Sequence, residues 1–333
     1  AEEKMERNIV EKIVKASGVA KGDLVLVHFW GEDADKPIAN GFLTAVAALG
    51  ATPLLLQQAR SVNRDIFLAA GETCFDERYF NIFSAFDAVI DVFAYRPVVL
   101  GCEMEETKFN LYRKYMAQLF SVLTKCKRFT QVRLPTAGNA EESGLTAGDY
   151  IARMTRAYDI DYGALRAACM KERERLSGAK RLTLHTGDGH RLFFTLTGRE
   201  WHIDAGNGDL PCGEVYIAPA EAETHGEVYF KKLYVEDLGA FDSVTLYIEG
   251  GRVRGSDDPR VTAFFKGLPE ENTVVCELGF GMNPNVTELS GYTVLDEKTA
   301  GTFHIAVGAN SMFGGENTAS MHMDFVGAGQ VEF

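Results

Sequence analysis

Two of the seven histidines in this 333-residue chain lie beside carboxylates in a glycine-rich C-terminal stretch. His322 and Asp324 form an H-x-D motif within an apolar run, and a strand's two-residue period would point both side chains to the same face. His304 and Glu277 each interrupt an apolar, strand-like segment, where an unpaired polar side chain costs several kcal/mol to bury. Imidazole and carboxylate together are typical ligands of zinc, cobalt, manganese or iron. The pattern therefore indicates a catalytic metal site.

The same residues also fit a structural interpretation. A buried histidine is commonly a hydrogen-bonded core residue, and buried acids can cap strand ends or pair with bases. No cysteine belongs to the group, which disfavours a structural tetrathiolate site, and strand alternation predicts that Cys276 faces away from Glu277. The pattern alone names no reaction.

The first half of the chain alternates helices and strands. Apolar residues at helical spacing predict a helix after Met5, and further helices are expected at 38–49 and 106–125. Strands are expected at 24–29, 53–56, 88–93 and 129–134, an order typical of a parallel sheet covered by helices. No GxGxxG or GxxxxGK[ST] motif follows the first strand, so this half is predicted to be a scaffold.

The sequence pattern changes from helices to short strands and turns after a charged helical segment expected at 149–176. A hairpin is predicted at 181–186 and 191–197, and strands at 215–217, 228–233 and 244–248. We therefore predict an α/β protein of two domains. Residues 1–165 form an N-terminal open parallel α/β sheet domain, and residues 166–333 form a C-terminal β-rich α+β domain that carries the metal site.

Composition narrows the partners and the compartment. A formal net charge of −13 disfavours nucleic acid, which is bound through clustered Lys and Arg. The six cysteines are far apart with no CxxC pair, which favours a reducing compartment. No apolar run is long enough to span a membrane, and the charged start is unlike a signal peptide. We expect a cytoplasmic protein with no membrane partner.

Ordered motifs along the chain resemble one known family, the M29 aminopeptidases, also called aminopeptidase T or S or thermophilic metallopeptidases. The motifs are KGDLVLV, PCGEVYIAP, LYIEGGRV, ELGFGMNP, DEKTAGTFHIAVG and GGENTASMHMDFV. The resemblance implies an N-terminal α/β domain, a C-terminal domain with the site, and a homodimer. It also implies five metal ligands, which are Glu214, Glu277, His304, His322 and Asp324. The family has a tyrosine ligand where this chain has Ser311, which leaves open the native metal and the number of ions.

The resemblance implies a metallo-aminopeptidase, a hydrolase that removes N-terminal residues from peptides by metal-activated water. One or two ions of zinc, cobalt or manganese would be the cofactor, and a small peptide or amide the substrate. Glu214 or Glu277 would transfer the proton, and Lys298, in a segment similar to the family's EK-x-x-GT, would stabilise a carboxylate or an oxyanion.

Two alternatives remain open. The chain also resembles 2,5-dihydroxypyridine dioxygenase, a non-haem Fe(II) ring-cleaving enzyme, in its closing G-x-N, GG and H-x-D elements. That enzyme's pattern has histidine where this chain has Glu277, and apolar residues in place of Glu214 and His304, so the sequence favours the peptidases. The second alternative is a non-catalytic homologue that binds a metal or a ligand, suggested by Ser311.

Overall fold

The chain folds into two compact units. The structure, a computed structural model, describes residues 5–97 and 104–333. Its contacts group the residues up to Tyr162 with Gly206–Pro211 as the first unit, and group Gly163–Ala205 with Cys212–Phe333 as the second. The chain therefore returns briefly to the first unit, whereas the sequence predicts one boundary at 165.

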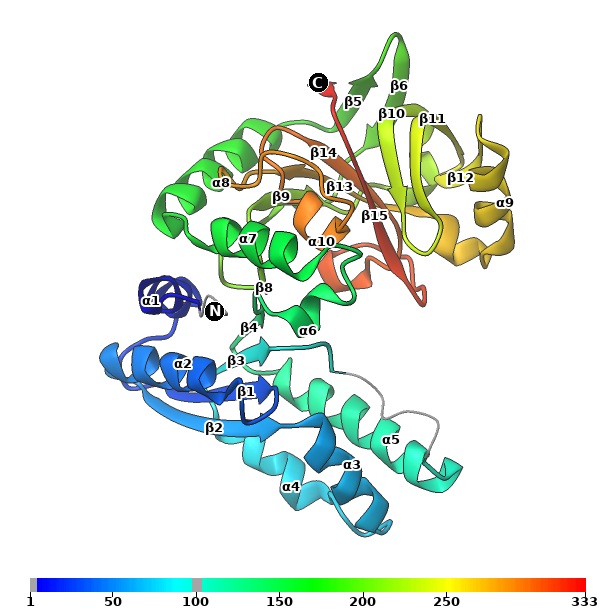
Figure 1. The fold of residues 1–333 in the computed structure, drawn as a ribbon. Coiled ribbons are helices and arrows are strands. Elements are labelled where there is room, and N and C mark those ends of the chain that lie inside the picture. Colours follow the sequence, from blue (N-terminus) through cyan, green and yellow to red (C-terminus); the bar gives the residue numbers. More distant parts are fainter. Residues whose placement is uncertain (1–4, 98–103) are drawn as a thin grey trace. The chain divides into compact units, whose positions relative to one another are not determined.

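The first unit is a parallel sheet flanked by helices (Figure 1). Its five strands lie in the order β2-β1-β3-β4-β8, and all four neighbouring pairs are parallel, as the alternating pattern predicts. The strands are β1 (Leu24–Trp30), β2 (Thr52–Gln58), β3 (Ala88–Phe93), β4 (Arg128–Arg133) and β8 (Asp209–Leu210). The α-helices are α1 (Arg7–Ala16), α2 (Lys36–Ala48), α3 (Arg60–Ala69), α4 (Glu77–Asn81), α5 (Glu106–Leu123), α6 (Ala137–Ala140) and α7 (Ala147–Tyr158), with a 3-10 turn η1 (Ile82–Ala85).

The second unit contains two antiparallel sheets. A six-stranded sheet has the order β12-β11-β10-β6-β5-β16, and a five-stranded sheet has the order β15-β14-β13-β9-β7. The strands are β5 (Arg181–Thr186), β6 (His190–Thr195), β7 (His202–Asp204), β9 (Glu214–Ile217), β10 (His225–Val235), β11 (Gly239–Glu249), β12 (Arg252–Ser256), β13 (Val275–Gly281), β14 (Phe303–Gly308), β15 (His322–Gly327) and β16 (Gln330–Glu332). The helical elements are α8 (Tyr162–Leu176), α9 (Pro259–Gly267), α10 (Thr293–Asp296), η2 (Glu221–Glu223), η3 (Glu270–Thr273) and η4 (Ser311–Phe313). The predicted β-rich α+β architecture is confirmed.

The helix expected across 149–176 is two helices. α7 ends at Tyr158, and Asp159 has a ψ of 65°, outside the helical region, before α8 begins at Tyr162. Aspartate competes with the backbone for hydrogen bonds and is a weak helix former, and the break contains two of them, Asp159 and Asp161. In the parts of the chain that the structure describes, no helix has both the length and the hydropathy needed to cross a bilayer.

Candidate metal centre

All five predicted metal ligands lie on the five-stranded sheet of the second unit. Strand register pairs Gly279 of β13 with His304 of β14. Glu277 of β13 and Asp324 of β15 are both paired with the same residue of β14, Ala306. Side chains of registered residues share a face, so the polar groups gather on one side. The opposite face is apolar: Leu278, Ile305 and Phe325 are registered with one another and are fully buried.

The first group of potential ligands contains Glu214, Glu277 and His304. His304 Nε2 lies 3.2 Å from Glu214 Oε2 and 3.2 Å from Glu277 Oε1. The three ligand atoms are within 4.8 Å of one another, which is close enough for one cation to contact all of them. The His304 side chain has no exposed surface, so this end of the site is closed to solvent.

The second group contains Glu277, His322 and Asp324. His322 Nε2 lies 3.4 Å from Glu277 Oε2 and 3.7 Å from Asp324 Oδ2, so the H-x-D side chains do share a face. Glu277 belongs to both groups and turns one oxygen toward each histidine. The His322 side chain is 28% exposed, so the site meets solvent at this end.

The donor atoms fit a divalent cation. Three carboxylates and two imidazoles, without a thiolate, suit zinc, cobalt, manganese or iron. Asp324 Oδ1 is buried and has no hydrogen-bond partner. A buried, unpaired carboxylate oxygen is costly, and coordination to a cation would satisfy it.

Lys298 and Glu297 support Glu214 from the side. Lys298 Nζ lies 2.6 Å from Glu214 Oε1 and 2.6 Å from Glu297 Oε1, and the lysine side chain is 2% exposed. Burial lowers the pKa of Lys298, but the carboxylates of Glu214 and Glu297 outweigh it and hold the pKa well above its ordinary value. The ammonium therefore stays charged and fixes the position of Glu214. Glu297 is a contact that the sequence interpretation missed, although its place beside Lys298 in a largely apolar stretch is a signal.

Cys276 corrects a prediction made from strand alternation. The pairing of β13 with β14 shifts register between Val275 and Glu277, which is a β-bulge at Cys276. The bulge turns Cys276 toward His322, and its Sγ lies 3.6 Å from His322 Nδ1. The same nitrogen lies 2.8 Å from the carbonyl oxygen of Ala309. With Nδ1 engaged, the Nε2 atom of His322 is directed at the ligand group, an arrangement typical of metal-binding histidines.

Metal affinity is expected to rise with pH. Burial lowers the pKa of His304, but hydrogen bonds to Glu214 and Glu277 outweigh it and raise the pKa to about 10. Below that pH the ring carries a proton that a cation must displace, so affinity should increase roughly tenfold per pH unit for each proton released. Zinc titrations at pH 6, 7 and 8, in buffers of different ionisation enthalpy, measure both affinity and proton release. An affinity that stays constant over this range would contradict the expectation.

Gly279 is required by the position of the His304 ring. A Cβ atom at Gly279 would lie 2.0 Å from His304 Nε2, so Gly279→Ala must displace the imidazole. We expect this variant to lose at least about tenfold in metal affinity, comparable to removing a hydrogen-bond partner of a ligand. Gly267→Ala is the matched control, because a Cβ there meets nothing within 4 Å. Calorimetric zinc titration compares the two, and equal affinities would show that the ring does not bind the ion.

Ser311, at the family's tyrosine position, is exposed at the start of η4. A serine hydroxyl is a poorer metal ligand than a phenolate, and the two ligand groups above are formed without Ser311.

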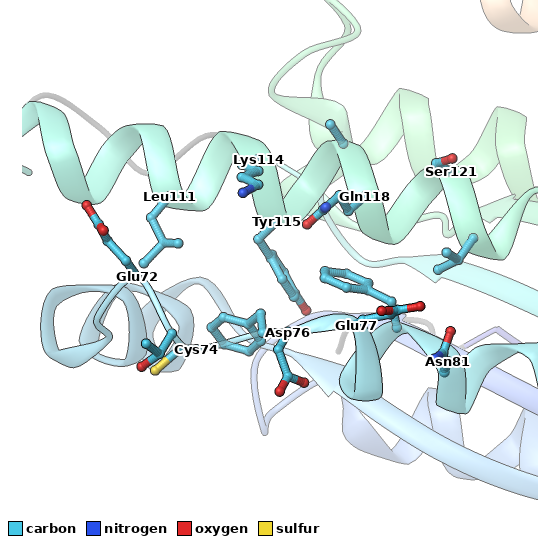
Figure 2. A pocket seen from close by; sticks show the side chains of 15 residues that line it. Glu72, Cys74, Asp76, Glu77, Asn81, Leu111, Lys114, Tyr115, Gln118 and Ser121 are labelled. Atoms are coloured by element: carbon cyan, nitrogen blue, oxygen red, sulfur yellow. The ribbon is translucent and has the colours of Figure 1, made fainter.

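Two cavities are lined by residues other than the five predicted ligands. Figure 2 shows the one in the first unit, about 580 Å³ in volume, which is lined by Lys114 and Tyr115 of α5, by Glu77 of α4 and by Cys74. The other, about 620 Å³, lies over β5 and β6 of the six-stranded sheet. Within residues 5–97 and 104–333, the only groups of three or more ligand-type side chains are the two that share Glu277.

Two solved structures share the fold of this chain. 2,5-Dihydroxypyridine dioxygenase from Pseudomonas putida KT2440 aligns with a TM-score of 0.67 at 13% identity, over 98% of this chain and 92% of that one. Wild-type AmpT from Thermus thermophilus aligns with a TM-score of 0.66 at 18% identity, over 96% of this chain and 92% of that one. No family model and no curated protein sequence matches the chain. At these identities the likeness shows the fold and a structural relationship to both proteins.

Proposed function

We propose that this protein is a metal-dependent hydrolase that acts as an aminopeptidase on small peptides. The observation that carries the proposal is the position of Glu277, which belongs to two groups of potential ligands at once. A carboxylate shared by two cations is the arrangement expected of a two-metal hydrolytic site. The structural likeness to AmpT and the family motifs around all five ligands support the same class.

The five side chains divide the work in this proposal. Glu214 and His304 would hold one ion and His322 and Asp324 the other, and Glu277, which belongs to both ligand groups, would take part in both sites. Divalent ions at these positions would polarise a scissile carbonyl and make a water molecule more acidic. Glu214 or Glu277 would accept the proton of that water and return it to the leaving amine. Lys298 holds Glu214 through its 2.6 Å ion pair and keeps that carboxylate oriented.

The dioxygenase alternative uses fewer of these residues. Its fold is equally similar, and the group of Glu277, His322 and Asp324 alone could hold one ferrous ion. Non-haem Fe(II) oxygenases commonly use two histidines and one carboxylate, whereas this group has one histidine and two carboxylates. That alternative also leaves the buried contact between His304 and Glu214 without a role, so we favour the hydrolase.

Metal analysis and a substrate panel test the proposal. The metal-loaded full chain is incubated with peptides that carry a free amino terminus, with the same peptides acetylated, and with 2,5-dihydroxypyridine under air. We expect two zinc, cobalt or manganese ions per chain and cleavage of the free-amine peptides only. If the protein instead holds one oxygen-sensitive ferrous ion and cleaves the ring, it is a dioxygenase and the hydrolase proposal is wrong. If it binds no metal, the result favours the non-catalytic binding protein.

A further inference from the structure

Three aromatic side chains gather beside the ligand groups. His202 of β7 and Tyr216 of β9 stack with ring centroids 5.4 Å apart, and Phe313 of η4 meets the Tyr216 ring edge-on at 5.4 Å. All three are partly exposed. We call them the aromatic cluster. Such edge and stacked contacts stabilise ring positions while leaving an apolar surface for another group.

The aromatic cluster is continuous with the candidate metal centre. Tyr216 lies two residues beyond Glu214 on the same strand, so the two side chains share a face. Its register partner is Gly279, which pairs in turn with His304. The Phe313 ring is 6.1 Å from the ring of His322, at the end of the site that solvent reaches.

The segment that carries Phe313 is held in place by specific contacts. His202 Nε2 lies 3.1 Å from the carbonyl oxygen of Phe313, and Arg199 hydrogen-bonds the carbonyl of Gly314. The Asn310 amide donates to Glu221 Oε1 at 2.8 Å and to the Cys276 carbonyl at 3.0 Å. The ring is therefore presented to solvent by a fixed turn, and the adjoining Met312 is 82% exposed.

We propose that the aromatic cluster receives the apolar side chain of the substrate whose polar group reaches the metal centre. The inference rests on the proposed function and specifies its substrate class, which is peptides that begin with an aromatic or large aliphatic residue. A group held at His322 has the Phe313 ring as its neighbour. An apolar side chain beside it is removed from water, whereas a methyl group is too short to gain the same contact.

Binding of amino acid hydroxamates tests this inference separately from turnover. A hydroxamate binds a metal ion through two oxygens, so L-phenylalanine and L-alanine hydroxamates differ only in the side chain. Calorimetry on the zinc-loaded full chain should show tighter binding of the phenylalanine form by about tenfold or more. Phe313→Ala should remove this preference and leave zinc content and alanine hydroxamate affinity unchanged. Phe313→Leu, a milder change, should retain an intermediate preference.

Phe193→Ala is the matched control. Phe193 is 38% exposed and stacks on His225 with centroids 5.2 Å apart, but it lies on the six-stranded sheet. We expect this variant to keep the full preference. Equal affinities for the two hydroxamates in the unmodified protein, or a preference that survives Phe313→Ala, would overturn the inference. Peptide cleavage with no such preference would leave the hydrolase intact, and a preference without cleavage would refute the hydrolase alone.

Discussion

Glu277→Gln is expected to release both metal ions and to abolish activity while the fold is retained. An amide keeps the shape of the side chain but removes the charge that faces His304 at 3.2 Å and His322 at 3.4 Å. Removing a mere hydrogen-bond partner of a metal ligand costs about 10- to 100-fold in affinity, so loss of a shared ligand should exceed the upper value. Zinc content by mass spectrometry and peptide cleavage measure the effect, and far-ultraviolet circular dichroism checks the fold.

Two further variants test whether the effect of Glu277→Gln is due to its membership of both ligand groups. Glu214→Gln should remove one ion and keep the other, because Glu214 belongs to only one ligand group. Glu227→Gln is the matched control, since Glu227 also contacts a histidine, His190 at 3.0 Å, on the six-stranded sheet. A Glu277→Gln protein that retains two ions would refute the shared-ligand arrangement.

Lys298→Met is expected to destabilise the protein by about 3–5 kcal/mol. The substitution leaves the Glu214 carboxylate without its ammonium, and the cost of breaking a buried ion pair is the unpaired charge that remains. Burial raises the pKa of Glu297 well above its ordinary value, so the cost is expected mainly at Glu214. Urea unfolding of the metal-free protein measures the effect. Lys12→Met is the matched control, because Lys12 pairs with Asp159 at the same distance, 2.6 Å, but the side chains are 42% and 52% exposed. An exposed pair of this kind contributes at most about 1 kcal/mol.

The loss of stability caused by Lys298→Met should depend on pH in a defined direction. Burial raises the pKa of Glu214, but Lys298 and His304 outweigh it and lower the pKa to about 2 from an ordinary value of 4.5. A carboxyl group whose pKa is lowered on folding stabilises the protein above pH 4.5, and this contribution disappears as the pH falls through about 2. The difference between Lys298→Met and the unmodified protein should thus be full at pH 7 and shrink below pH 4.5. If the stability difference between Lys298→Met and the unmodified protein grows as the pH falls, the ion-pair explanation is wrong.

Much of the architecture follows from local patterns. The apolar segments at 24–29 and 88–93 become the neighbouring parallel strands β1 and β3, in which every residue except Leu24 is buried. On the five-stranded antiparallel sheet, two-residue alternation is enough to put His322 and Asp324 on one face and Phe325 on the opposite face. These predictions succeed because burial and strand period act on adjacent residues.

Other features depend on contacts that a sequence does not display. The bulge at Cys276 is set by the pairing of β13 with β14, and it reverses the direction expected from alternation. Glu297 and Lys298 are adjacent in sequence, but only the fold brings their ion pair to Glu214, 84 positions from Lys298. Helix α3 also went unpredicted, since in Arg60–Ala69 only Asn63 and Phe67 are buried and the apolar stripe is narrow.

The short return of Gly206–Pro211 to the first unit limits how this protein can be dissected. The chain crosses between units after Tyr162, after Ala205 and again after Pro211, and β8 within the returning segment pairs with β4. A fragment cut near residue 165 would leave the β4 edge without its partner and open to pairing with other chains. The other fragment would carry a displaced strand just ahead of Glu214. For separate expression, the fragment of the second unit should therefore carry a linker in place of this hexapeptide, and the fragment of the first unit should carry the hexapeptide at its end.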